Sequence, residues 1–274
     1  MTKRTEQEEQ IYYETEASEQ EFLEWYRTKE HKKYERPSVT IDNVMLAYNR
    51  EEDALKILLI KRKAHPYKGC WALPGGFVNP NESTDKGCLR ETFEETGVQL
   101  KESNIEQLYT FSTPNRDPRD WVITVSYIAF LNQEALKAGD DASEAAWFDI
   151  TLTEGFALLH HQMEHIDLDI GAETTSAAST GNLAFDHEKI ISTAIKRIIG
   201  KMYYQPRLLT LLGESFTIAE ARKVYAKFLG VPYQTLDHSN FKKDLLKFLK
   251  EVDERPTGVG RPSKFYALDI PYLK

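Results

Sequence analysis

The spacing of apolar residues divides the chain into stretches typical of strands and stretches typical of helices. Val39 to Ala47 and Leu55 to Ile60 are mostly apolar runs that predict two strands, and the polar segment Asn49 to Asp53 joins them as in a hairpin. The same reasoning predicts further strands at Ile105–Phe111, Trp121–Leu131 and Trp147–Ile150.

Helices are predicted where apolar residues recur every three or four positions behind a start signal. The segment Ser18 to Glu21 has the form of a capping box and opens a short helix that runs to about Lys33. A second capping box, from Thr217 to Glu220, opens a helix that ends at Gly230. Helical spacing also covers His187 to Met202 and His238 to Val252.

These elements group into two domains and a helical extension at residues 1–36. One helix among several strands predicts an α+β domain over residues 37–166. A stretch rich in Gly, Ala, Ser and Thr at 167–183 predicts a linker. In residues 184–274, three helices, a Gly-Arg-Pro turn and an extended segment match a winged helix-turn-helix. A chain of 274 residues is long enough for two compact cores.

Charge is distributed unevenly between these regions. Residues 185–274 hold 16 basic and 10 acidic residues, a net charge of +6, whereas residues 1–184 have a net charge of −14. Net charges of opposite sign suggest that the two regions have different functions, one of them involving nucleic acid. No apolar run approaches the roughly 18 residues of a membrane span, and the charged N-terminus is not a secretory signal. The two cysteines, Cys70 and Cys88, have no metal-like spacing and form no disulfide framework. Together these features lead us to expect a cytoplasmic protein without membrane contact.

The segment Gly76 to Val98 carries the strongest chemical signal. On a helix, Glu91, Glu94 and Glu95 stand at positions i, i+3 and i+4, within about 100° of arc. Leu89 and Phe93 then fall on the opposite side and are expected to pack into the core. Like charges at this spacing repel one another unless a cation lies between them, and Mg²⁺ prefers such oxygen ligands.

A solvated acidic face is the simpler interpretation of the three glutamates alone. The full register of seven residue types, however, arises by chance in only about one in a million such chains. These seven residues are Gly76, Glu82, Arg90, Glu91, Glu94, Glu95 and Gly97.

This register, with the lead-in Trp71-Ala72-Leu73-Pro74-Gly75-Gly76, resembles the box of the Nudix hydrolases. The resemblance implies the Nudix α/β/α sandwich fold and chemistry that depends on Mg²⁺ or Mn²⁺. It implies that Glu91 and Glu95 are the principal metal ligands and that Glu94 is a ligand or the base for the attacking water. A carbonyl near Gly76 would be a further ligand.

The resemblance also implies that Arg90 pairs with carboxylates and orients them, with Glu82 as a supporting partner. Thr92 departs from the aliphatic residue usual in the family. Since threonine is β-branched like valine, we expect a packing adjustment there without loss of chemistry.

Residues outside the box supply further candidates. Glu144 stands in a predicted loop where many members of the family carry a catalytic glutamate, and it is either a base or ligand or a surface carboxylate. Arg116 and Arg119 can clamp a diphosphate, or they belong to a charged turn that Asp117 caps. This motif resembles Nudix proteins associated with ADP-ribose, and the resemblance places Phe111 beside the adenine. Arg62, which precedes the box, is a further substrate-binding candidate.

A cluster of histidines, His160, His161 and His165, has the composition of a metal site. These residues lie among apolar and linker residues, so we expect them on a surface helix instead.

The basic C-terminal domain offers candidates for contact with double-stranded DNA. The third predicted helix carries Lys242, Lys243 and Lys247, and the wing offers Arg261 and Lys264. A helical domain that only forms a dimer is the alternative. Together with the box, residues 184–268 resemble the Nudix-related transcriptional regulators of NAD metabolism, in which ADP-ribose controls DNA binding.

The sequence therefore predicts a homodimeric hydrolase that cleaves a nucleoside diphosphate derivative, foremost ADP-ribose to AMP and ribose 5-phosphate. The intact charged positions of the box favour retained catalysis. The alternative is a DNA-binding regulator that senses ADP-ribose with weak or no hydrolysis.

Overall fold

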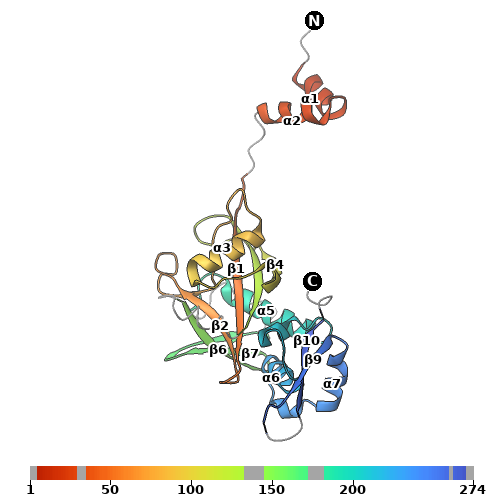
Figure 1. The fold of residues 1–274 in the computed structure, drawn as a ribbon. Helices are drawn as coiled ribbons and strands as arrows, with labels where there is room; N and C mark the ends of the chain where they lie inside the picture. The colour runs from red at the N-terminus through yellow and green to blue at the C-terminus, as the bar shows by residue number, and fades with distance from the viewer. Residues whose placement is uncertain (1–4, 30–34, 133–144, 172–181, 259–261, 270–274) are drawn as a thin grey trace. The chain divides into compact units, whose positions relative to one another are not determined.

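The structure, a computed structural model, describes residues 5–29, 35–132, 145–171, 182–258 and 262–269. The chain falls into two compact units, residues 1–36 and residues 37–274 (Figure 1). None of the described helices is both long enough and apolar enough to span a membrane.

The first unit is a helical hairpin of α1 (Glu6–Thr15) and α2 (Glu19–Thr28). Both helices begin with a capping box, which confirms the helix predicted behind Ser18, although α2 ends at Thr28 and α1 was not predicted. The Tyr13 and Trp25 rings stack with centroids 4.8 Å apart, and Glu9 accepts a hydrogen bond from Trp25. No residue of either helix is buried, so this hairpin has no core of its own.

The second unit is built on a mixed sheet with the strand order β4-β5-β1-β2-β6-β7-β8, and β3 pairs with β2. The central strands β1 and β5 run parallel, and the other neighbours are antiparallel. The predicted hairpin and all the predicted strands are present. The strands are β1 (Ser38–Asn49), β2 (Ala54–Lys61), β3 (Trp71–Ala72), β4 (Ile105–Phe111), β5 (Val122–Leu131), β6 (Ala145–Thr153), β7 (Phe156–His161) and β8 (Glu164–Asp169).

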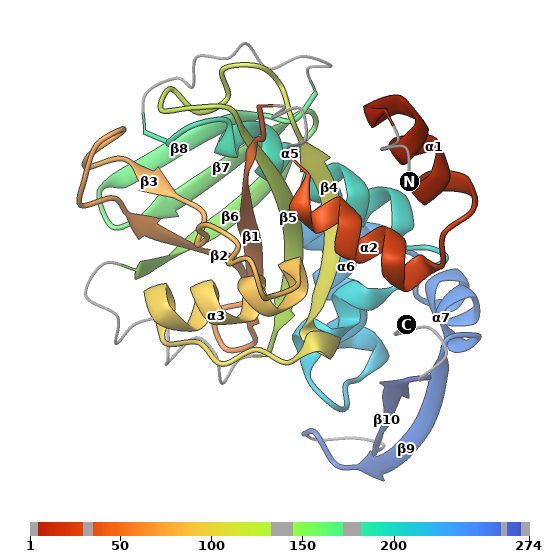
Figure 2. The same ribbon diagram turned by 90° about the horizontal axis from the view of Figure 1, so that it is seen from above.

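Two helices cover the two faces of this sheet. Met45 and Ala47 of β1 share an apolar cluster with Cys88 of α3 (Thr84–Thr96). Val44 and Leu46 point the other way and share a cluster with α5 (His187–Lys201). Figure 2 shows the sheet between α3 and α5, which confirms the predicted α/β/α sandwich.

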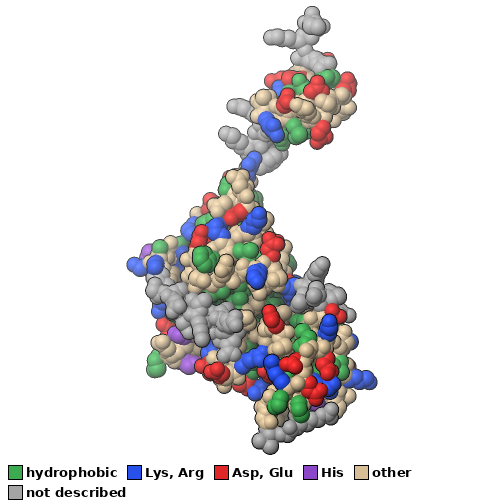
Figure 3. Space-filling view, viewed as in Figure 1, with side chains coloured by type: hydrophobic (Ala, Val, Ile, Leu, Met, Phe, Trp, Pro, Cys, Tyr) green, Lys and Arg blue, Asp and Glu red, His purple; other side chains and the backbone are tan. Residues whose placement is uncertain are grey.

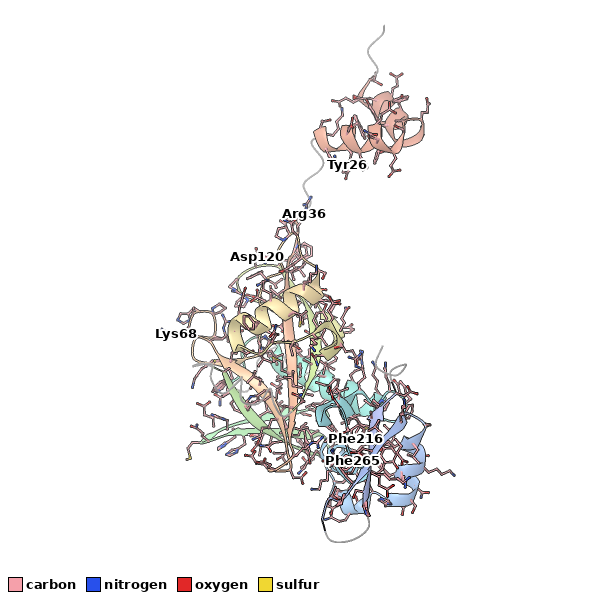
Figure 4. All side chains as sticks on the ribbon, in the orientation of Figure 1. Tyr26, Arg36, Lys68, Asp120, Phe216 and Phe265 are labelled. Atoms are coloured by element: carbon pink, nitrogen blue, oxygen red, sulfur yellow. The ribbon has the colours of Figure 1, made fainter. Side chains whose placement is uncertain are left out.

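The C-terminal region has the form of a winged helix, as predicted. The backbone of Phe216 pairs with that of Tyr266, and the labels of Phe216 and Phe265 in Figure 4 mark this junction. The third helix was predicted to reach Val252, but it ends at Leu246, and the next residues form the first strand of the wing. The elements are η2 (Arg207–Leu212), α6 (Ile218–Leu229), η3 (Tyr233–Thr235), α7 (His238–Leu246), β9 (Leu249–Arg255) and β10 (Ser263–Leu268).

The winged helix does not have a separate core. One apolar cluster runs from the inner face of the sheet through α5 to α6, Leu245 and Tyr266. Gly230 ends α6 so close to the sheet that a Cβ there would lie 2.6 Å from the Leu152 carbonyl oxygen. The sequence indicated two compact cores, and the structure joins them because α5 packs against both domains.

The surface helix expected for the histidines was wrong. His160 and His161 lie on β7, and His165 lies opposite His160 on β8. Ala157 and Leu159 are buried and alternate with exposed Phe156 and Leu158, a period of two that predicts a strand. Strand β8 also occupies the first residues of the expected linker; residues 172–181 of that linker lie outside the described part of the chain.

Candidate functional site

Helix α3 brings two of the box glutamates to the edge of a cleft. Ser83 caps its first turn by accepting from the Lys86 N–H, and Gly97 ends it in the left-handed conformation, with φ 69°. The helix buries a stripe of Cys88, Thr92 and Thr96. This stripe is roughly a quarter-turn away from the predicted core side, where Leu89 packs against the apolar cluster as expected.

Phe93 is therefore not in the core, as was expected, but 56% exposed. Thr92 takes the buried position, where its Oγ1 accepts a hydrogen bond of 3.1 Å from the Asn43 side chain. The hydroxyl explains why a threonine fits where the family usually has an aliphatic residue, because it accepts from the buried amide nitrogen of Asn43.

The cleft has a volume of about 380 Å³ and draws on six parts of the chain. These parts are β1, the end of β2, the segment before α3, α3 itself, the turn before β5, and the start of α5. The lining residues that bear charge or an aromatic ring are Asp42, Arg62, Phe77, Glu91, Glu95, Arg116, Asp117, Arg119, Phe185 and His187.

Glu91 and Glu95 present their carboxylates to this cleft. Glu95 accepts a hydrogen bond of 2.8 Å from the Gly75 N–H. Burial raises the pKa of Glu95 to about 7, and the neighbouring charges of Glu91 and Asp42 add to the effect. At Gly76 a Cβ would lie 2.5 Å from the Glu91 carboxyl carbon, so only glycine leaves room for that carboxylate.

Arg90 holds the carboxylates of the box in place. Its guanidinium donates to both oxygens of Glu82, at 2.6 and 3.0 Å, and to Glu91 at 2.7 Å. This bidentate bond lowers the pKa of Glu82 to about 2. The arrangement is the one that the resemblance implied, with Glu82 as the supporting partner.

Glu94 departs from the expected arrangement. Its side chain is 55% exposed, it is paired with Arg90 at 3.1 Å, and it does not line the cleft. Glu144 lies outside the described residues, and within them no three acidic, histidine or cysteine side chains form a ready-made metal site. The Gly76 carbonyl accepts from the Ile41 N–H.

A divalent cation nevertheless fits the donor set. Glu91 and Glu95 both reach the cleft, and burial, with the charges of Glu91 and Asp42 beside it, raises the pKa of Glu95. Two carboxylates with space beside them are what Mg²⁺ uses when water and substrate oxygens complete its shell.

Arg116 lies in the turn before β5, as predicted, and its side chain is only 4% exposed. Its guanidinium forms a bidentate pair with Asp186, at 2.6 and 3.1 Å, and lies 3.3 Å from Asp42. Burial opposes the charged form of Asp42, but His187 and Arg116 hold the pKa of Asp42 below its ordinary value.

The other two arginines lie nearer the mouth of the cleft. Arg119 is paired with Asp117 at 2.7 Å, and the Asp117 carboxylate also accepts the Arg119 N–H, as in the predicted charged turn. The Arg119 guanidinium lies 5.5 Å from the Phe77 ring and 5.6 Å from the Phe185 ring. Burial and the charge of Arg119 lower the pKa of Arg62, which lies 4.8 Å from the Phe185 ring.

Sequence reasoning missed Phe185, Asp186 and His187. The His187 Nδ1 accepts from the Leu73 N–H at 2.9 Å, so the proton is on Nε2, 3.3 Å from Asp42. The available signal was a polar pair at the start of a predicted helix. Nothing local distinguishes such a pair from an ordinary helix start.

Phe111 does not reach the cleft. It is 3% exposed and belongs to the apolar cluster beneath the sheet, so the structure separates it from Arg116 and Arg119.

The predicted DNA-contacting residues are distributed over α7 and the wing. Lys243 and Lys247 are exposed and Lys242 is half-buried, beside a second cleft of about 400 Å³ between α6, α7 and β10. Lys264 is paired with Glu251 inside the wing at 2.9 Å, and Arg261 lies outside the described residues. Figure 3 shows basic and acidic side chains mixed on the visible face of this region.

Two family models match the chain. A NUDIX domain model matches residues 37–166, and a model of the NrtR DNA-binding winged helix domain matches residues 208–268. An ADP-ribose pyrophosphatase from Methanocaldococcus jannaschii is 39% identical over 163 residues, which are 60% of this chain and 76% of that protein.

A longer similarity extends over both domains. The ADPR responsive transcriptional repressor NtrR from Acinetobacter baylyi is 29% identical over 255 residues, covering 91% of this chain and 88% of that protein. A crystal structure of a MutT/nudix family protein from Enterococcus faecalis is 51% identical and covers 98% of this chain and 100% of its own, with a TM-score of 0.88. The structure of Shewanella oneidensis NrtR with a 27mer DNA is 29% identical, covers 86% and 95%, and has a TM-score of 0.63.

Proposed function

The chain belongs to the Nudix family, and we propose that it is an ADP-ribose-responsive DNA-binding regulator that keeps the hydrolytic residues of that family. The sequence alone favoured the hydrolase as the main role. Here the regulator is the main role and the hydrolase the second, because a curated relative that matches both domains is a repressor. The pyrophosphatase matches 60% of the chain.

The observation that carries this proposal is the shared construction of the cleft. Phe185 and His187 line it, yet they lie beyond the NUDIX match at 37–166. They stand at the start of α5, which packs against α6 of the winged helix. A ligand in the cleft therefore touches the segment that leads to the DNA-binding domain.

The cleft suits a nucleoside diphosphate. Arg62, Arg116 and Arg119 supply planar cations that can bind phosphate oxygens in pairs, and Phe77 and Phe185 supply ring faces for a base. ADP-ribose is the member of this class that both curated relatives are named for.

DNA binding is tested by fluorescence anisotropy with duplexes from the neighbourhood of the gene, with and without ADP-ribose. Lys242→Ala with Lys243→Ala should weaken binding at least about tenfold and flatten its salt dependence, because two phosphate contacts are lost. Lys101→Ala, an exposed lysine of the Nudix domain, is the control. Absence of any ADP-ribose effect on the wild type would refute the regulator.

Retained hydrolysis is the second function that we propose, on the strength of Glu91, Glu95 and the Arg90 clamp. A bound Mg²⁺ or Mn²⁺, held by Glu91 and Glu95, would supply a Lewis acid for the charge that develops on the diphosphate. The arginines would orient the diphosphate, and Arg90 would keep Glu91 directed into the cleft.

The hydrolase is tested by metal-dependent release of AMP from ADP-ribose. Glu95→Gln should lower the rate by about a hundredfold or more, since a negatively charged carboxylate ligand becomes a neutral amide. Glu102→Gln, at an exposed position away from the cleft, is the matched control. A wild type that turns over no nucleoside diphosphate derivative would rule out hydrolysis and leave the regulator standing.

A further inference from the structure

The residue before α5 behaves unlike the caps of the other helices. Asp186 occupies the N-cap position, and aspartate is among the residues that cap best there. Yet its side chain makes no cap hydrogen bond, whereas Ser83, Thr217 and Asp237 all cap their helices. Its backbone, at φ −100° and ψ 26°, also lies outside the extended conformation of Ser83 and Thr217, so capping requires this residue to change conformation. Its carboxylate has another partner.

That partner is Arg116. Its Nη2 lies 2.6 Å from Asp186 Oδ1 and its Nε lies 3.1 Å from Oδ2, a bidentate pair that engages both carboxylate oxygens. Arg116 also lines the cleft and is the most deeply buried of the three arginines there, with 4% of its side chain exposed. The guanidinium fork that binds a carboxylate is equally suited to a phosphate.

The charges around Arg116 are also unbalanced. Asp42 and Asp186 both face this one guanidinium, and His187 donates to Asp42 without adding a second fixed cation. A diphosphate that enters the cleft meets an arginine whose Nε and Nη2 are already paired with two carboxylates, and it competes with them for the guanidinium. If Asp186 is the partner displaced, Asp42 keeps its hydrogen bond from His187. Asp186 can then accept from backbone N–H groups at the start of α5.

We propose that the diphosphate of the ligand and Asp186 compete for Arg116, so that ligand binding releases Asp186 to cap α5. This rests on the proposed function, whose ligand and DNA response it explains. The released carboxylate would accept from the backbone N–H of Glu188 or Lys189, the usual partners of a cap. The switch converts the presence of an anionic ligand into a change at the first turn of α5.

The surroundings of this turn suit a two-state element. Phe185, just before the cap, has φ 54°, in the left-handed region that a phenylalanine rarely adopts. Its ring is held by Arg62, which lines the cleft, at 4.8 Å and by Tyr67 at 4.9 Å. A strained residue held by contacts that a ligand disturbs can move when those contacts change.

The other end of α5 reaches the DNA-binding helices. The carbonyl of Met202, which caps α5, accepts the Tyr225 hydroxyl of α6 at 2.5 Å. The Tyr225 ring packs edge-on against Phe241 of α7, with centroids 4.9 Å apart. One helix thus joins the cleft to α7 through contacts between packed side chains, which is the physical requirement for coupling between two sites.

The switch is tested directly by hydrogen exchange of the amides in the first turn of α5 in the full chain. In the wild type, ADP-ribose should slow exchange there at least about threefold. Asp186→Asn leaves no charge for Arg116 but keeps a good cap, so this variant should be protected without ligand. Asp186→Ala should stay unprotected with and without ligand. Unchanged exchange in the ligand-saturated wild type overturns the switch.

DNA affinity supplies the second measurement, and it separates this inference from the proposed function. Where ADP-ribose changes the DNA affinity of the wild type by about tenfold, the ratio in both Asp186 variants should fall below about twofold. Both should bind ADP-ribose at least as tightly as the wild type by calorimetry, since the competitor is gone. Asp167→Asn, a matched change at an exposed position of β8 outside the cleft, should keep the response.

Two outcomes stand against these expectations. If the Asp186 variants respond to ADP-ribose like the wild type, the competition for Arg116 is wrong while the regulator stands. If the wild type shows the change in exchange but no change in DNA affinity, the regulator fails while the switch stands. Asp186→Asn is nearly isosteric, so an unfolded Asp186→Ala would not block either measurement.

Discussion

Glu95 is the residue at which pH and metal binding should meet. Burial raises its pKa to about 7, so below that pH the metal-free carboxyl holds a proton that a cation must displace. We expect Mn²⁺ affinity to fall about tenfold per pH unit below pH 7 and to level off above it. Titrations near pH 6 and pH 8 measure this. Glu95→Gln should bind weakly at both, and equal wild-type affinities would contradict the expectation.

Gly76 tests how tightly the Glu91 carboxylate is confined. A Cβ at this position would lie 2.5 Å from the Glu91 carboxyl group, which Arg90 holds from the other side. Gly76→Ala should therefore displace Glu91 and weaken Mn²⁺ binding about tenfold or more, with little loss of thermal stability.

Gly200→Ala on α5 is the matched control, because nothing lies within 4 Å of its added Cβ. In a helix this change should stabilise by about 0.5–1 kcal/mol and leave metal affinity unchanged. Unaltered Mn²⁺ binding in Gly76→Ala would show that Glu91 has room to spare.

At the scale of residues, the sequence predicted what depends on local helix geometry. Glu91 and Glu95 share a cleft because residues four apart lie on one face of a helix. The partners of Arg116 could not be foreseen, because Asp42 and Asp186 are brought to it from distant parts of the chain. The prediction for Phe93 was wrong for a related reason. Periodicity locates the apolar face of a helix, but only its packing against the sheet decides which stripe is buried.

At the scale of elements, α6 offers a clean test of capping. Thr217 accepts from the Glu220 N–H, and Glu220 accepts from the Thr217 N–H, as the capping-box prediction required. Thr217→Ala should cost about 1 kcal/mol and lower Tm by about 2–4 °C for a unit of this size. Ser18→Ala removes the same kind of box from α2, whose hairpin buries nothing, and should leave the main transition unmoved. Equal shifts from the two variants would contradict this account.

Element boundaries followed from sequence where a local signal ends the element. Helix α6 ends at Gly230 in the left-handed conformation, as predicted. Helix α7 was predicted too long, because Phe248 and Leu249 continue the helical spacing of Leu245. Its end is set by the pairing of β9 with β10, a contact between segments that only the folded chain brings together.

At the scale of the whole second unit, the sequence predicted both domains but not how they join. The compositional linker and the change in net charge mark a division, whereas the apolar cluster through α5 is continuous. Charged contacts follow the same junction: Lys227 on α6 lies 3.3 Å from Asp53 in the β1–β2 turn. Each residue of such a pair is an ordinary surface charge in its own part of the sequence. No local sequence pattern therefore predicts the contact.

Arg50 is the residue on which this junction can be tested. From the end of β1 it pairs with Glu220 at 2.8 Å and donates to the carbonyls of Leu212 and Ser215, so it ties the sheet to three places in the winged helix. Arg50→Ala should destabilise the unit by about 1–3 kcal/mol, since hydrogen bonds to a charged donor are lost.

The docking of the two domains, beyond stability alone, is read by limited proteolysis and by the ADP-ribose response. We expect Arg50→Ala to expose the segment 203–217 to protease and to reduce the effect of ADP-ribose on DNA affinity, because α5 then moves against a looser partner. Arg255→Ala removes a half-exposed pair within the wing and should cost less than about 1 kcal/mol. A full ligand response in Arg50→Ala would mean that α5 alone, through Met202 and Tyr225, carries the coupling.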